Sequence, residues 1–208
     1  MVMMIEFAIG RVMAVMMRHR VCRRFLASQR GVAAIEFAMI MPVLLILFLS
    51  SFDVGNAIIV YLKVRTATYE LAAITNQYGT GSTAQISTAT MSAITSATTQ
   101  VMAPYSSSST AVTISQIKAT SATAATVSWS YTVNGTALSG SYTGLPANMA
   151  KNSCNSTYPC YFILSSVSYS YTPLFGHYMT GPLTLSDTLL MTPRVSKCVQ
   201  YNSVPSTC

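Results

Sequence analysis

The run VAAIEFAMIMPVLLILFLSSF, residues 32–52, decides the architecture of this chain of 208 residues. Within it, Glu36 is the single charged residue. An α-helix rises about 1.5 Å per residue, so a helix of this length spans about 30 Å, which is the thickness of the hydrocarbon core of a bilayer. The run therefore predicts one transmembrane helix.

Basic residues cluster directly before this run. Positive charge that flanks a membrane helix stays on the cytoplasmic side. We therefore expect a single-pass membrane protein with a cytoplasmic N-terminus and an exported C-terminal region. A nucleic-acid-binding protein would instead carry its basic residues as a patch on a folded face. Six of the twelve Lys and Arg residues precede residue 31, namely Arg11, Arg18, Arg20, Arg23, Arg24 and Arg30.

The composition also indicates export. Charged residues make up 8% of the chain, against roughly a quarter in typical soluble domains. A cleaved secretory signal is the competing interpretation of the apolar run. It is disfavoured because the run is long for a signal core and no small-x-small cleavage site follows before Asp53. We expect Asp53 to be a solvated charge at the point where the helix leaves the membrane.

Glu36 is the unusual residue of the run. A carboxylate costs about 2.5–3.5 kcal/mol at the centre of a membrane helix and less near its end. Glu36 lies about 7 Å from the start of the run by helix geometry. Two interpretations stay open. The side chain either reaches the lipid headgroups without a further role, or it pairs with a charge on a neighbouring subunit.

The stretch Arg30–Gly55 resembles TadE-like proteins, which are minor pseudopilins of the tight-adherence (Flp) pilus system. Many members read RGxAAxEFAxxxPxLLxLxxxxxxxG, and this sequence has the specified residue at each of those positions. Basic residues, then Gly31, then Glu36 inside an apolar helix are also the layout of a type IV prepilin leader. With the basic leader included, the resemblance covers about a quarter of the chain, and the remainder is much more loosely similar. The resemblance implies a location in the bacterial inner membrane, with the C-terminal region periplasmic or extracellular.

The resemblance implies that a prepilin peptidase cuts after Gly31, so that the mature chain starts at Val32 with Glu36 as its fifth residue. It also implies that Glu36 neutralises the amino terminus of an adjacent subunit during assembly. The expected partners are this peptidase, other pilins or pseudopilins, the pilus assembly platform and membrane lipid, with no nucleic acid, small-molecule substrate or cofactor. TadG-like proteins share the anchor with a different processing fate. The alternative is therefore an uncleaved, anchored envelope protein that binds a pilus component or a surface polymer.

The helical pattern continues beyond the membrane run. An apolar stripe predicts that the first helix, with Pro42 tolerated inside it, extends to about residue 78, where Gly79 favours its end. The stripe packs either on the chain's own sheet or on a helix of another subunit. Residues 82–103 predict a second helix, with Ser82 as its N-cap. The stripe consists of Val60, Val64, Ala67, Leu71, Ile74 and Tyr78.

The C-terminal half changes to a period of two. Residues 125–133 alternate apolar and polar side chains and predict a strand with one wet face, followed by the turn signal Asn134-Gly135. Segments 111–117, 166–171 and 183–189 predict further strands. Two helices followed by about four strands predict an α+β, pilin-like fold with an antiparallel sheet. The expected organisation is a leader over 1–31, a transmembrane helix over 32–53, a periplasmic helical region over 54–103 and a β-rich, disulfide-stabilised domain over 104–208.

Four of the five cysteines fall in the exported region: Cys154, Cys160, Cys198 and Cys208. An even number in an oxidising compartment predicts two disulfides, and four cysteines allow three connectivities. We favour Cys154–Cys160 and Cys198–Cys208, because short local loops need no assumed tertiary proximity. A zinc site is disfavoured, since no Cys-x-x-Cys motif occurs and no histidine lies near these cysteines.

Residues for catalysis are scarce beyond the membrane run. The exported region holds Asp53, Glu70 and Asp187 as its acidic residues and His177 as its histidine. Because acid–base and nucleophilic catalysis need positioned groups of such kinds, we expect no enzyme; an anchored enzyme that uses His177 or Asp187 is the weakest hypothesis. Tyrosines at strand positions more often fill a core than form a binding surface. Those in question are Tyr158, Tyr161, Tyr169, Tyr171 and Tyr178.

Overall fold

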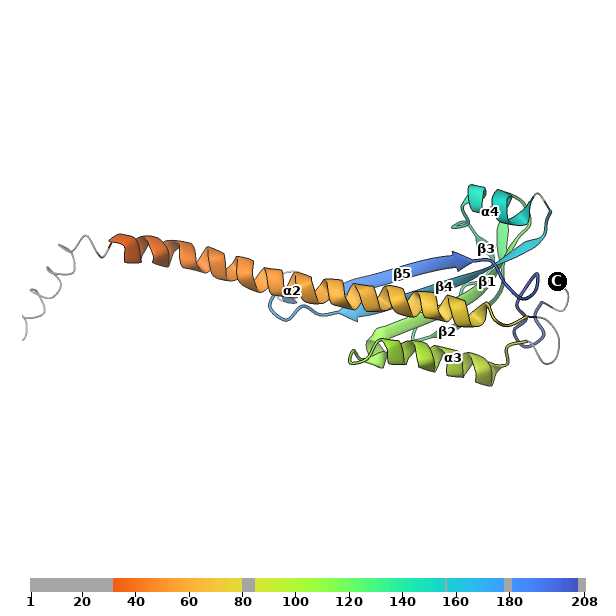
Figure 1. Ribbon diagram of the computed structural model, residues 1–208, viewed down its shortest axis with the longest axis horizontal. Coiled ribbons are helices and arrows are strands. Elements are labelled where there is room, and N and C mark those ends of the chain that lie inside the picture. The colour runs from red at the N-terminus through yellow and green to blue at the C-terminus, as the bar shows by residue number, and fades with distance from the viewer. Residues whose placement is uncertain (1–31, 80–84, 156, 178–180, 206–208) are drawn as a thin grey trace, which may run out of the picture. The chain divides into compact units, whose positions relative to one another are not determined.

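The computed structural model describes residues 32–79, 85–155, 157–177 and 181–205 (Figure 1). The leader with Gly31 falls outside these residues, as do Ser82, Tyr178 and Cys208. The chain divides between Phe52 and Asp53 into two compact units. The first helix, α2, carries residues of both units.

Helix α2 runs from Val32 to Thr75 and contains Pro42, so the predicted long helix is confirmed. It ends three residues before the predicted position. After Thr75 the backbone tightens into bonds of the i to i+3 type, in which Gln77 N donates to Ile74 O and Tyr78 N donates to Thr75 O. The helix therefore ends in a turn that precedes Gly79.

The apolar stripe of α2 packs on the chain's own sheet, which decides between the two alternatives left open by the sequence. Val60, Val64, Ala67 and Leu71 are completely buried. They form one hydrophobic cluster with side chains from the sheet and from the second helix, and Ile74 and Tyr78 pack against this cluster. Burial of this stripe fixes the C-terminal part of α2 to its own domain.

The second helix, α3, runs from Thr88 to Val101 and lies beside the C-terminal part of α2 (Figure 1). Its N-cap is Ser87, whose side-chain oxygen accepts a hydrogen bond from Thr90 N at 3.1 Å. The prediction of Ser82 as N-cap was therefore wrong, because the chain enters the helix five residues later. Met91 and Ile94 bury one face of α3 in the same core as the stripe of α2.

The C-terminal half forms a curled antiparallel sheet with strand order β3-β2-β1-β4-β5, so the predicted α+β, pilin-like architecture is confirmed. The sequence predicted the four long strands, but it did not indicate the two-residue strand β3 or the helix α4. The bounds are η2 Ser107–Ser109, β1 Thr110–Ala119, β2 Ala125–Val133, β3 Ser141–Tyr142, α4 Ala147–Cys154, β4 Cys160–Tyr171 and β5 Leu183–Met191.

The sheet buries side chains on both faces, because successive strand residues point to opposite sides. On β4, Ile163 and Val167 belong to the cluster under α2 and α3. Their neighbours Phe162 and Leu164 belong to a second cluster, which also contains Cys154 of α4. We call the first side the helix face of the sheet.

A β-bulge in β2 corrects the prediction that the odd-numbered residues from 125 to 133 share one face. Trp129 pairs with Gln116, whereas Val127 pairs with the next residue, Ile117, so that one extra residue is accommodated in β2. Trp129 consequently packs in the cluster on the helix face, and Ala125 packs in the second cluster. A period-two pattern in the sequence cannot show such a change of face.

Candidate functional site

Residues 32–52 of α2 expose a dense set of large apolar side chains. The most apolar 18-residue window of α2 has a mean hydropathy of 2.6, and none of it is buried. Met39, for example, is 75% exposed and Phe48 is 72% exposed. Among the described helices, α2 is the one that is long and apolar enough to cross a membrane, which is consistent with an anchor or a signal.

Glu36 lies on this exposed part of α2, one helical turn after Val32. Residues four apart lie on the same side of a helix, so Val32 and Glu36 share a face. The carboxylate of Glu36 is the one charge within residues 32–52, and it is exposed. The arrangement offers a carboxylate close to the position where a cleaved chain would begin.

Asp53 is buried and clamped, so the prediction of a solvated charge was wrong. Its side chain is 8% exposed. Oδ1 accepts a hydrogen bond from Leu174 N at 3.0 Å, and Oδ2 accepts from Phe175 N at 3.0 Å and from Gly176 N at 2.7 Å. Three backbone donors replace the water that the carboxylate would otherwise bind, and hydrogen bonds to an ionised acceptor are among the strong ones.

Tyr171, the last residue of β4, also contacts Asp53. Its hydroxyl donates to the backbone oxygen of Asp53 at 3.4 Å. Burial raises the pKa of Tyr171, and the nearby carboxylate of Asp53 raises it further. The end of β4 and the loop after it are thus tied to α2 at Asp53 through both side-chain and backbone atoms.

Sequence analysis did not detect this clamp. The donors lie 121 to 123 residues after Asp53 in the chain and are backbone N–H groups. The one available signal was Gly176, a residue that allows a tight turn. The same loop contains His177, whose carbonyl accepts a hydrogen bond from Gly181 N at 2.9 Å. Asp187 lies in the middle of β5 and pairs with Val167.

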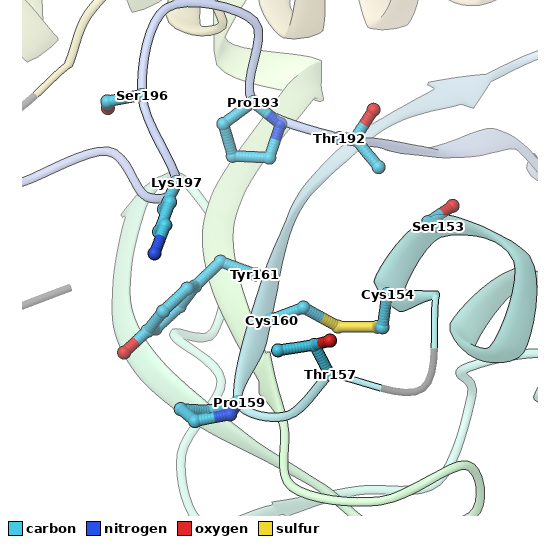
Figure 2. A pocket seen from close by; sticks show the side chains of 10 residues that line it. All are labelled: Ser153, Cys154, Thr157, Pro159, Cys160, Tyr161, Thr192, Pro193, Ser196 and Lys197. Carbon is cyan, nitrogen blue, oxygen red and sulfur yellow. A yellow bond between two sulfur atoms is a disulfide. The ribbon is translucent and has the colours of Figure 1, made fainter.

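The predicted disulfide between Cys154 and Cys160 is present, with Cα atoms 5.7 Å apart. It links the end of α4 to the start of β4 and lies beside a pocket of about 310 Å³ (Figure 2). Hydroxyl groups and the ammonium group of Lys197 line this pocket, without a carboxylate. Cys198 is also disulfide-bonded. Because Cys208 lies outside the described residues, the pairing of Cys198 with Cys208 stays a prediction.

Removal of this link by the double substitution Cys154→Ser, Cys160→Ser is expected to lower the free energy of unfolding by about 2 kcal/mol, the entropic value for so short a loop. Denaturant unfolding of the full chain in detergent, followed by the fluorescence of Trp129, measures the change. The fifth cysteine, Cys22 in the leader, provides the control for loss of a thiol: in the uncleaved chain, Cys22→Ser should leave the midpoint unchanged. An unaltered midpoint in the double variant would show that the disulfide does not stabilise the fold.

The tyrosines of the second half mainly fill the core, as expected. Tyr161 and Tyr171 are buried, and Tyr169 packs against the cluster on the helix face. Tyr158 packs against the second cluster. Tyr178 lies outside the described residues.

The side of the sheet opposite the helix face carries rows of hydroxyl groups. One row crosses four strands in register, because Thr113 pairs with both Thr132 and Ser166, and Ser166 pairs with Thr188. The hydroxyls of Thr113 and Thr132 are 3.0 Å apart. We call this surface the hydroxyl face, and its half-buried or exposed members are Thr113, Ser130, Thr132, Ser166, Ser168, Ser186 and Thr188.

A family comparison identifies the segment that carries Glu36 and Asp53. Residues 31–73 match the model of the family described as TadE-like protein. This segment is therefore similar to TadE-like proteins. The match covers nearly the whole of α2 and none of the strands. We find no match to this TadE-like chain among curated proteins or among solved structures.

The TadE-like family is generally non-enzymatic. Across the part of the chain that the structure describes, no group of three or more His, Cys, Asp or Glu side chains could hold a metal ion. The chemistry that the described residues do offer is of three kinds: an exposed apolar helix with one carboxylate, a clamp at Asp53 and a surface of hydroxyl groups.

Proposed function

We propose that this TadE-like chain is a minor pseudopilin that serves the assembly of type IVb Flp/Tad pili. A prepilin peptidase removes residues 1–31, and the chain then stays in the inner membrane through residues 32–52. Glu36 guides its association with other pilins or pseudopilins and with the assembly platform. Residues 53–208 face the periplasm or the exterior.

The observation that carries this proposal is the exposed apolar part of α2, with Glu36 one turn after Val32 inside the TadE-like segment. A carboxylate near the end of a membrane helix is tolerated, but it gains stability from a partner of opposite charge. The amino group of a chain that starts at Val32 is such a partner. A neighbouring subunit can supply this group when two helices lie side by side and staggered.

The proposed organisation assigns a separate task to each part of the chain. The basic leader sets the orientation in the membrane, since positive charge stays in the cytoplasm. The apolar helix holds the chain among lipids and other pilins. The exported domain contains the C-terminal part of α2, whose stripe is buried in the core of that domain, and it carries the disulfide.

The amino-terminal residue of the membrane-extracted protein tests this proposal. In cells with the prepilin peptidase we expect the chain to start at Val32, and in cells without it we expect the leader to remain. Gly31→Leu should leave the leader in place even in cells that have the peptidase. Gly55→Leu is the matched control, since a side-chain carbon at Gly55 meets nothing within 4 Å. A retained leader in every strain would contradict the pseudopilin proposal.

The second candidate is an uncleaved, anchored envelope protein that binds a pilus component or a surface polymer. The hydroxyl face favours it, because rows of uncharged donors and acceptors suit a polymer that is itself rich in hydroxyl groups. The same measurement separates the two candidates, since an uncleaved anchor keeps residues 1–31 whether or not the peptidase is present.

A further inference from the structure

The loop that follows β4 exposes two large apolar side chains beside the clamp. We call residues 172–177 the clamp loop. Leu174 is 69% exposed and Phe175 is 45% exposed, although their backbone N–H groups are both bonded to Asp53. The clamp therefore fixes the backbone of the loop while its apolar side chains point away from the core.

The position of the clamp in the chain places these side chains near the end of the apolar part of α2. Asp53 directly follows residues 32–52, the part of α2 that is long enough to fill the hydrocarbon core of a bilayer. If this part spans the membrane, Asp53 lies at the boundary between hydrocarbon and the polar layer outside it. That layer is about 5–7 Å thick on each side.

The clamp holds the backbone of the loop close to Asp53. The N atoms of Leu174, Phe175 and Gly176 lie within 3.0 Å of the carboxylate oxygens of Asp53. The loop backbone is therefore held next to the residue that follows the apolar part of α2, which brings the side chains of Leu174 and Phe175 near the expected membrane boundary. The carboxylate of Asp53 is buried and accepts three hydrogen bonds. The domain can therefore approach the lipid without removing water from an exposed charge at this position.

We propose that the clamp loop is a second membrane contact, in which Leu174 and Phe175 insert among the lipids of the exported leaflet. This inference rests on the proposed membrane anchoring of residues 32–52, and it adds a second point at which the domain contacts the membrane. With α2 as one contact and the clamp loop as another, the exported domain has a restricted tilt at the membrane surface. A freely swinging domain would present its surfaces to partners in many orientations.

Quenching of a new tryptophan by brominated phosphatidylcholine tests the contact. The full chain is reconstituted into vesicles of this lipid, with Leu174→Trp as the probe and Val195→Trp as the matched control. Val195 is 64% exposed, but it follows the far end of β5, about 30 Å away along a strand of nine residues. The unsubstituted protein supplies the baseline, because Trp129 is its one tryptophan and is buried.

We expect the Leu174→Trp probe to lose at least half of its added fluorescence in brominated vesicles and to emit at shorter wavelength than the control. Phe175→Trp, a conservative change, should behave in the same way. Quenching of Leu174→Trp no greater than that of Val195→Trp would overturn the contact. The exposed side chains of the loop would then be left for contact with another protein. Flotation with the vesicles distinguishes the failures, since a chain that does not float refutes the anchor as well.

Discussion

Replacement of Glu36 with alanine is expected to abolish fibre assembly while the protein remains inserted in the membrane at a normal or higher level. Insertion should not suffer, because removal of a carboxylate from an apolar helix lowers the free energy of transfer into lipid. Electron microscopy of surface pili, together with membrane fractionation of the variant, measures the two effects.

The size of the effect follows from the proposed pairing of Glu36 with the amino group of a neighbouring subunit. Two unit charges 4 Å apart attract by about 4 kcal/mol at an effective dielectric constant of 20. A loss of this size lowers the association constant of each subunit contact by roughly three orders of magnitude. Because the proposed assembly step depends on this contact, pili should be absent rather than merely shorter.

Two further variants separate charge from shape at this position. Glu36→Gln keeps the size of the side chain and removes the charge, so it should fail as fully as the alanine variant. Glu70→Ala removes an exposed carboxylate from the same helix outside residues 32–52 and should assemble normally. Normal pili in cells with Glu36→Ala would remove the pairing role of Glu36 and leave it as a tolerated charge near the lipid headgroups.

Replacement of Asp53 with alanine is expected to lower the free energy of unfolding of the domain formed by residues 53–208 by about 3 kcal/mol. Each hydrogen bond to a charged group contributes about 1.5–3 kcal/mol, and three such bonds share one carboxylate, so their sum is less than additive. Domains of this size are stable by about 5–15 kcal/mol, so the loss is a large fraction of the total. Denaturant unfolding of the full chain in detergent, monitored through Trp129, measures it.

Matched variants show whether the effect comes from the clamp. Asp53→Asn keeps one oxygen acceptor of similar size and should lose less than the alanine variant. Asp187→Ala removes a half-buried carboxylate from β5 and should change stability by less than about 0.5 kcal/mol. Equal stabilities of Asp53→Ala and the unsubstituted protein would show that water replaces the carboxylate without loss, and the clamp would then have no stabilising role.

The main elements of the fold could be read from local patterns. The apolar run 32–52 predicted the exposed part of α2, and the four-three spacing from Val60 to Leu71 predicted its buried stripe. The alternation in 125–133 predicted the bounds of β2, which they match. Each of these patterns depends on the period of one element, so neighbouring residues in the sequence contain all the information that is needed.

Other features depend on where the bulge lies and on which distant segments meet. The bulge places Trp129 and Ala125 on opposite faces of the sheet. The indole N–H of Trp129 then donates to Val199 O at 2.9 Å, which draws the C-terminal segment into the core. Periodicity does not encode a pairing partner 70 residues away, so sequence reasoning left this segment as an unassigned tail.

The candidate site shows the same division. The sequence by itself determined the apolar run, the place of Glu36 in it and the resemblance of Arg30–Gly55, because these are properties of consecutive residues. Only the tertiary structure decided the state of Asp53. A lone carboxylate after an apolar run is solvated unless donors reach it, and the donors here are backbone N–H groups that every residue except proline carries. The sequence therefore does not show which N–H groups bind Asp53, and only the fold brings them to it.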